Sequence, residues 1–545
     1  MSASAWQNRI QVRLGFSPIG ASCQLGASAV RTAGTEMISG AFASWQAALC
    51  GLGTTFGYSE ITDNQARTAL TTGGTAMSFM ATPPNPSAMG GASVKYGPVS
   101  ASGIVISYLI DKNYTQNKAN PDLGANGTLV TNLRLTPLIV AKLLTQSYRS
   151  DTPGDGRGAG ATVPASNPDS LLQDRDFLAL NPDFKYFYPT QIPDGLIVPF
   201  GDSDAAAKVW AWLRSDPQAN SFLAGNPVDG ATINSAYKSL NLATDTTVDS
   251  FPKNDSSTFR TGDWPAPGYG TLDMRPYAND FTDGAFRTVT ANAGKRTNWD
   301  ITLVPPQATS VGPQVPGTRF TFAITTSQAA ALYGLPTAAF VSSPTDTSPG
   351  VSATPSSMAE GFAGVTGGYP LTMKTYAAVN VCQTPLSELA ADAKFLDYAA
   401  GSGQTSGTKL GQLPLGYVPM TSSDTAQTSV MAAALRAEVT SPKCASHLNP
   451  SAPSGGTTGV STPGSSGSGA GTSIGTGSST PAGGVTTPGG RTATAAAKST
   501  ALPGGITAAA YVTPAGQYAL LAALCFFVPC AIAGPSLLLA ARKRT

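Results

Sequence analysis

Hydrophobic and polar positions along the first 444 residues follow two periods, one typical of strands and one typical of helices. Short apolar runs rich in β-branched and aromatic side chains predict strands. These runs are residues 10–16, 103–110, 195–200, 319–324 and 375–381. Apolar residues spaced three and four apart predict helices. They occur at residues 36–49, 137–144, 204–214 and 387–400. Because strands and helices alternate, we expect an α/β fold with largely parallel sheets.

The pattern disappears over residues 445–515. This segment is rich in Gly, Ser, Thr and Pro, and its stretch SGGTTGVSTPGSSGSGAGTSIGTGSSTPAGGVTTPGG contains neither an aromatic residue nor an acid. Such a composition cannot bury enough apolar surface to offset the entropy lost on ordering. We therefore expect a globular domain over residues 1–444 followed by a flexible linker.

The C-terminal end predicts a membrane anchor. Residues 518–541 carry no charge, and Arg542, Lys543 and Arg544 follow directly. An apolar stretch of this length is typical of one transmembrane helix. Positive residues favour the cytoplasmic side, so the tail 542–545 predicts a cytoplasmic C-terminus and places the bulk of the chain outside the cell.

The N-terminal end does not match that expectation. The residues after Met1 read SASAWQNRIQVRLGF, without the basic segment and apolar segment of a signal peptide. Two explanations stay open: an export signal upstream of this start, or a tail-anchored protein that faces the cytosol. The basic tail and the cysteines favour the first.

Cysteine usage agrees with an exported domain. Of six cysteines, Cys525 and Cys530 belong to the predicted span, and four lie in the rest of the chain: Cys23, Cys50, Cys382 and Cys444. An even number in an oxidising compartment predicts disulfides. Sequence proximity favours Cys23–Cys50 and Cys382–Cys444 among the possible pairings, and four buried free thiols remain the alternative.

Composition excludes several functions. The chain has 33 Lys+Arg against 31 Asp+Glu, without the basic stripe of a nucleic-acid-binding protein. The single histidine, His447, lies beside the linker, which argues against a Ser-His-Asp triad or a multi-histidine metal site. The globular region also lacks a Gly-x-Ser-x-Gly motif and a metal-ligand motif. We therefore expect a protein that is not an enzyme, without a metal or another cofactor.

The order of several segments resembles the phosphate-binding proteins of ABC importers, which have a type II periplasmic-binding-protein fold. The resemblance is diffuse and covers most of residues 8–440. Its segments are Gly34-Thr35-Glu36-Met37, FGYSEITDNQARTALTTGGTAMSFMATPP, IVPFGDSDAAAKVWAWL, and YPLTMKTYAAVN followed by KFLDYAAGSGQTSGTKLGQLPLGYVPM. It implies two α/β lobes that close on a small solute. The first lobe would comprise residues 1–108 and about 360–440, and the second about 109–359.

The resemblance also implies a set of site residues. Thr35, Thr82 and Ser203 match positions whose hydroxyls bind the ligand, and Gly34, Glu36 and Asp204 lie beside them at helix starts. Local structure offers a second interpretation of each position. Thr35 can be a helix N-cap with Glu36 in the first turn, Ser203 or Asp204 can cap the next helix, and Thr82 can end a strand.

Four departures from the family pattern weaken the anion site. Glu36 replaces a small hydroxyl residue, Pro83 replaces the proton-accepting aspartate, and Ala205 replaces a threonine. The family's arginine is missing around Val198. A charge-assisted hydrogen bond contributes roughly 1.5–3 kcal/mol, so the loss of two such bonds weakens the binding of an anion by ~10²–10⁴-fold.

Two functions therefore remain. The first is an extracellular, membrane-anchored solute receptor for phosphate or another oxyanion, with an ABC permease as candidate partner. The second is a structural or adhesive surface protein that reuses the fold with a degenerate cleft.

Overall fold

The computed structural model describes residues 29–115, 123–152, 161–191, 193–253, 258–259, 271–300, 302–303 and 307–448. They belong to one compact unit, Met1–Pro450. The predicted strand 10–16, the linker beyond residue 448 and the predicted membrane span 518–541 lie outside the described residues. Within those residues, no helix combines the length and the hydropathy needed to cross a bilayer.

A seven-stranded sheet is the centre of the fold, with strand order β10-β4-β12-β3-β1-β2 and β13 paired with β4. Its strands are β1 (Val30–Gly34), β2 (Phe56–Glu60), β3 (Met77–Met80), β4 (Val94–Ile110), β10 (Phe320–Thr326), β12 (Thr372–Asn380) and β13 (Tyr417–Val418). Only β1, β2 and β3 pair in parallel, whereas β12 runs antiparallel to both β3 and β4. The sheet is therefore mixed rather than largely parallel, because β12 returns from the second lobe in the opposite direction.

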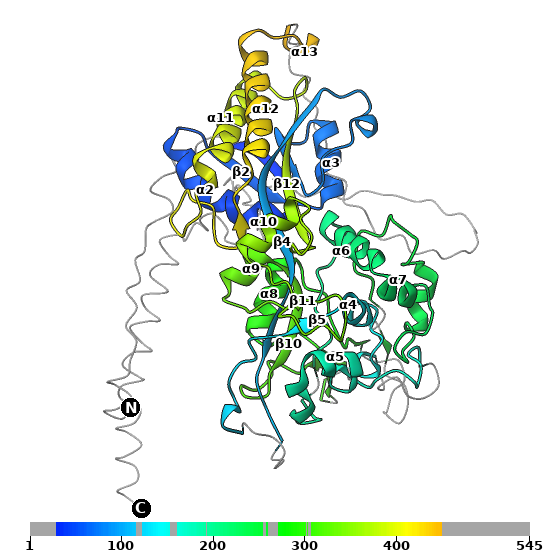
Figure 1. Ribbon diagram of the computed structural model, residues 1–545. Coiled ribbons are helices and arrows are strands. Elements are labelled where there is room, and N and C mark those ends of the chain that lie inside the picture. Colours follow the sequence, from blue (N-terminus) through cyan, green and yellow to red (C-terminus); the bar gives the residue numbers. More distant parts are fainter. Residues whose placement is uncertain are drawn as a thin grey trace, which may run out of the picture. The chain divides into compact units, whose positions relative to one another are not determined.

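Helices cover both faces of the first lobe (Figure 1). They are the 3₁₀ turn η2 (Glu36–Ile38), α2 (Ser39–Gly51), α3 (Asp63–Thr72), α11 (Leu386–Ala400), α12 (Ser422–Thr440) and α13 (Ala445–Leu448). On one face α2, α11 and α12 enclose an aromatic core around Trp45, Phe79 and Phe395. On the other face α3 packs Leu70 against Met80.

The second lobe is built on the far half of β4 and on β10 (Figure 1). Its helices are α4 (Pro137–Leu144), α5 (Arg175–Leu180), α6 (Asp204–Ser215), α7 (Pro217–Leu223), α8 (Phe281–Val289), α9 (Ser327–Leu332) and α10 (Pro355–Phe362). Small sheets pair β5 (Arg134–Leu135) with β11 (Ala339–Phe340), β6 (Thr258–Phe259) with β7 (Thr271–Leu272), and β8 (Arg296–Asp300) with β9 (Gln307–Ser310). Its core contains Tyr108, Trp210 and Phe322.

Short 3₁₀ turns complete the chain. They are η3 (Pro86–Met89), η4 (Leu123–Ala125), η5 (Arg149–Asp151), η7 (Leu171–Gln173), η8 (Pro182–Tyr186), η9 (Ser235–Leu240) and η10 (Ser402–Gln404). Residues 195–200, which the sequence predicts as a strand, form only the isolated bridges Ile197–Ala323 and Pro199–Ala278. Pro199 has no N–H to donate, which opposes a continuous ladder here.

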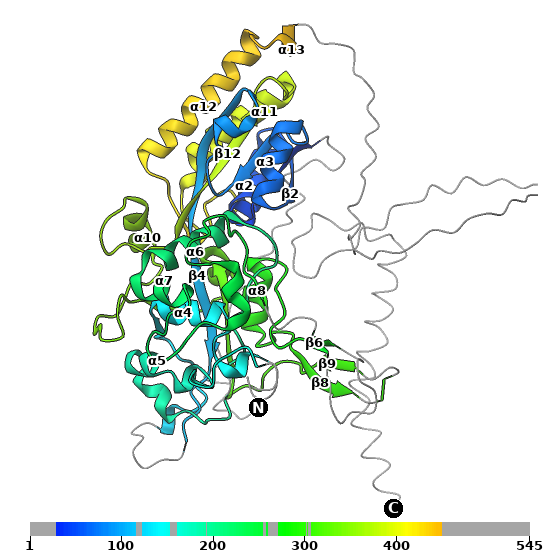
Figure 2. The same ribbon diagram turned by 90° about the vertical axis from the view of Figure 1, so that its right-hand side faces the viewer.

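One strand joins the two lobes. Residues Val94–Gly103 of β4 pair with β12, and residues Ile104–Ile110 pair with β10. At Gly103 a Cβ atom would lie 2.8 Å from the Met358 sulfur, so the change of partner takes place where a side chain has no room. The two lobes are therefore built on two halves of the same long strand (Figure 2), and the region in which they meet is called the cleft below.

Candidate binding cleft between the lobes

Contacts between the lobes gather at the starts of three helices. The first lobe supplies Glu36 from η2, α3 from Asp63 onward, and the segment after β3. The second lobe supplies the starts of α6 and α8. A helix start carries unpaired N–H groups and the positive end of the helix dipole, so each of these positions favours an anion.

Glu36 occupies the start of α8 in the manner of a bound anion. Its Oε2 accepts the Phe281 N–H at 2.7 Å, and its Oε1 accepts the N–H of Thr282 at 2.7 Å and the hydroxyl of Thr282 at 2.5 Å. The departure seen in the sequence therefore has a structural role. The carboxylate of one lobe caps a helix of the other.

Asp63 makes a similar link to α6. Its Oδ1 accepts the Ala81 N–H at 2.8 Å, and its Oδ2 accepts the Asp204 N–H at 3.0 Å. The residue is buried at the start of α3, where the capping box of Thr62 and Gln65 fixes the backbone. Asp63 thereby fastens the end of β3 to the second lobe.

Asp204 holds a third link. Its Oδ2 accepts the Thr82 hydroxyl at 2.6 Å and pairs with Arg67 Nη2 at 2.5 Å. Arg67 also donates to the Thr82 hydroxyl at 2.6 Å. One turn earlier, the Asn64 amide donates to Asp202 at 2.9 Å. Thr82 thus binds a carboxylate of its own chain.

The remaining predicted site residues have mainly local roles. Ser203 is the N-cap of α6, because its hydroxyl accepts the Ala206 N–H at 3.1 Å. Thr35 is buried, and its side chain makes no capping hydrogen bond. Gly34 has φ +156°, and a Cβ there would lie 2.1 Å from the Phe79 carbonyl oxygen. That strand position therefore requires glycine.

Sequence reasoning missed Asp63, Asn64 and Arg67. They lie within the segment FGYSEITDNQARTALTTGGTAMSFMATPP, whose resemblance to the family concerns its C-terminal end. The polar run DNQAR directly after Thr62 was the available signal, since a helix that starts in a cleft presents its first turn to the opposite lobe.

Burial and crowding shift the pKa values of these acids. Burial is the main cause that raises the pKa of Glu60 to about 7, with Asp280 adding to it. Burial and then the Asp204 charge raise the pKa of Asp63 to about 7. Burial, followed by Glu60 and Asp280, raises the pKa of Glu36 well above its ordinary value.

The cleft is therefore rich in carboxylates. Among ion pairs of described residues, Arg67 is the one cation bound to them. The acids named so far on its two sides are Glu36, Glu60, Asp63, Asp202, Asp204 and Asp280. The raised pKa values mean that part of these acids is protonated near neutral pH. A phosphate entering here would meet repulsion from those that stay ionised and compensation from one guanidinium.

The predicted disulfide between Cys382 and Cys444 is present. Cys50 is also disulfide-bonded, and its expected partner Cys23 lies outside the described residues. A cavity of about 560 Å³ lies in the second lobe, lined by Tyr114, Arg134 and Phe184 among others, and includes none of the cleft residues above.

No protein-family model and no curated protein matches the chain. Solved structures of phosphate-binding proteins are similar to it. One from Stenotrophomonas maltophilia is 14% identical, covers 76% of this chain and 94% of its own, and has a TM-score of 0.35. An ABC-type phosphate transport receptor from Vibrio cholerae is 9% identical, and the match covers 67% of this chain and 92% of the receptor, with a TM-score of 0.28. An ancestral soluble variant of the human phosphate-binding protein is 10% identical, and the match covers 75% of this chain and 94% of the variant, with a TM-score of 0.36.

Similarity at these identities and TM-scores does not indicate which ligand, if any, this chain binds. The fold itself rests on the described architecture: two α/β lobes that share β4, and a return to the first lobe through β12. The described residues form a mixed α/β fold of two lobes that share β4, which is the arrangement that the resemblance in the sequence implied.

Proposed function

We propose that this protein is a non-catalytic surface module in which the solute-binding fold is held closed by its own carboxylates. In this proposal Glu36 and Asp63 take the place of a bound oxyanion, and the molecule acts as a structural or adhesive body rather than as a phosphate receptor. The predicted span 518–541 would hold it at the cell membrane with residues 1–444 outside.

One observation carries the proposal. The N–H groups of Phe281, Thr282 and Asp204, which lie at helix starts of the second lobe, are all bonded to first-lobe carboxylates. Each of these hydrogen bonds contributes roughly 0.5–1.5 kcal/mol to a protonated acid and roughly 1.5–3 kcal/mol to an ionised one. A phosphate would have to displace these internal acceptors before it gained any of the same donors.

Capture of a small solute remains the second candidate, and the two-lobed fold favours it. The similar solved structures are described as phosphate-binding proteins and as a phosphate transport receptor. In that version the lobes open, a solute displaces the carboxylates, and an ABC permease receives it. Neither candidate involves catalysis, metal or another cofactor in the cleft.

Hydrogen exchange distinguishes the two candidates. We expect the amides of Phe281 and Thr282 to be protected in the full-length chain without added ligand, and phosphate to leave that protection unchanged. Glu36→Ala removes the acceptor and should speed exchange in this peptide. The control Glu360→Ala, an exposed glutamate of α10, should not. Fast exchange in the wild type that phosphate slows would contradict the closed module and favour the receptor.

A further inference from the structure

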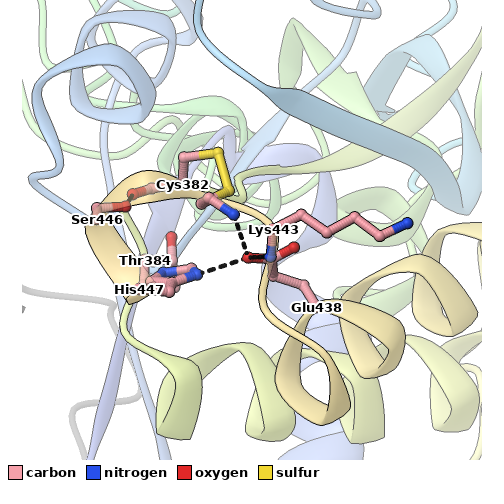
Figure 3. The surroundings of a disulfide bond; sticks show 7 residues. Cys382, Thr384, Glu438, Lys443, Ser446 and His447 are labelled. Atoms are coloured by element: carbon pink, nitrogen blue, oxygen red, sulfur yellow. Dashed lines mark hydrogen bonds and ion pairs between the residues drawn. A yellow bond between two sulfur atoms is a disulfide. The ribbon is translucent and has the colours of Figure 1, made fainter. Parts of the chain in front are cut away.

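Four side chains of metal-ligand type meet where the globular domain ends (Figure 3). Cys382 follows β12, Glu438 lies in the last turn of α12, and Cys444 and His447 come from the segment that ends in α13. The sequence showed no metal motif because these residues arise from three separate elements and have no regular spacing.

The ligand atoms are already close together. Glu438, Cys444 and His447 offer a carboxylate oxygen, a sulfur and a ring nitrogen that all lie within 4.8 Å of one another. Cys382 is not part of this group, but its sulfur is bonded to Cys444 and would become the fourth ligand after reduction. Glu438 and Cys444 are buried, and only 8% of the His447 side chain is exposed.

Two hydrogen bonds orient the histidine. His447 Nε2 lies 3.0 Å from the Thr384 carbonyl oxygen, and Nδ1 lies 2.9 Å from Glu438 Oε1. A carbonyl oxygen can only accept, so Nε2 carries the hydrogen and Nδ1 faces the carboxylate. Histidines that bind metals commonly donate their other N–H in this way. The backbone N–H groups of Lys443 and Cys444 hold the Glu438 carboxylate in place, both at 2.9 Å.

We propose that this cluster, Cys382–Glu438–Cys444–His447, binds a zinc ion when its disulfide is reduced. Two thiolates, one imidazole and one carboxylate form a tetrahedral ligand set that suits zinc, and thiolates select it over magnesium or calcium. Bond lengths of ~2.0–2.3 Å separate the ligand atoms of a tetrahedral zinc site by ~3.3–3.8 Å. The three atoms that now lie within 4.8 Å of one another would have to approach slightly, and the two sulfurs would have to move apart after reduction.

The chemistry balances with a dithiol reductant. The reductant supplies two electrons and two protons, becomes a disulfide itself, and leaves Cys382 and Cys444 as thiols. Zinc then displaces both thiol protons and binds His447 through Nδ1, in place of the present contact of Nδ1 with Glu438, because only deprotonated ligands bind.

In both states the end of the globular domain stays attached to the first lobe. In the oxidised chain the disulfide joins Cys444 to Cys382, the second residue after β12. The Ser446 hydroxyl also donates a hydrogen bond to the Cys382 carbonyl oxygen at 2.5 Å. The zinc ion would make the same connection in a reduced chain, so that the segment leading to residue 448 remains fixed whichever compartment the protein occupies.

Cobalt titration of the reduced, full-length chain tests the site. Co²⁺ replaces zinc in such sites, and its bonds to thiolates give charge-transfer absorption. We expect one equivalent bound with that absorption, and competition by Zn²⁺. Cys382→Ser and His447→Ala should weaken cobalt binding by more than ~100-fold, beyond the effect of losing a second-shell partner. The matched control Cys50→Ser should bind as the wild type does.

Two further readouts keep the test decisive. Oxidised His447→Ala should show the cooperative thermal unfolding of the wild type, which establishes that the variant folds. No thiolate absorption in the reduced wild type would overturn the proposal. So would full cobalt binding by folded His447→Ala, or loss of binding in Cys50→Ser.

Discussion

At the scale of single residues, two carboxylates determine the state of the cleft. Glu36 reaches Phe281 across 245 positions of sequence, and Asp63 reaches Asp204 across 141. The sequence indicated that Glu36 departs from the family pattern and weakens the anion site, but it could not show that Glu36 itself binds a helix of the other lobe. Contacts at such separations depend on the assembled lobes, which no local pattern contains.

Asp63 makes the stability of the protein depend on pH. Burial raises the pKa of Asp63 to about 7 from 3.8, so the folded state holds a proton that the unfolded state has released. The free energy of unfolding therefore falls as the pH rises through about 7. We expect a lower thermal midpoint at pH ~8 than at pH ~5.5, and Asp63→Asn should reduce this difference.

Asp245→Asn is the matched control. The Thr247 hydroxyl and N–H lower the pKa of Asp245, so this half-buried group stays ionised throughout the same pH range. An equal pH dependence in wild type and Asp63→Asn would show that Asp63 does not hold the additional proton.

At the scale of elements, helices with local signals were predictable. The apolar spacing predicted a helix at residues 137–144, and α4 has the same bounds, Pro137–Leu144. The local signals are clear here, because the Thr136 side chain caps the helix and a proline occupies its first position. The helix predicted at 204–214 is α6, Asp204–Ser215, capped by Ser203. By contrast, the strand predicted at 103–110 is only the second half of β4, Val94–Ile110. The first half consists of small and polar residues, which are not a strand signal by themselves, and α12 packs against it.

The Cys382–Cys444 disulfide should stabilise the elements at the end of the first lobe. It closes a loop with a sequence separation of 62 residues that contains α11 and α12. Chain-entropy theory gives about 4 kcal/mol for a loop of this length. Cys444→Ser should therefore lower the free energy of unfolding by about 2–4 kcal/mol in chemical denaturation.

Ser446→Ala is the comparison for that loss. It removes only the hydrogen bond to the Cys382 carbonyl and should cost about 1 kcal/mol. Equal effects of the two substitutions would mean that the disulfide adds little to the attachment of α13.

At the scale of the whole molecule, the family resemblance predicted two lobes and a return segment near the C-terminal end of the domain. The described residues have both features, through β4 and β12. The candidate site was less predictable. Thr82 and Ser203 do lie at the cleft, but they contact or follow groups of the chain itself, and the partners Asp63 and Arg67 were not singled out.

Calorimetric titration of inorganic phosphate into the full-length chain tests the closed cleft most directly. Internal carboxylates bind the helix-start donors, so we predict no saturable heat up to millimolar phosphate at neutral pH. Saturable binding with a micromolar dissociation constant would show that phosphate displaces Glu36 and Asp63, and would contradict the account.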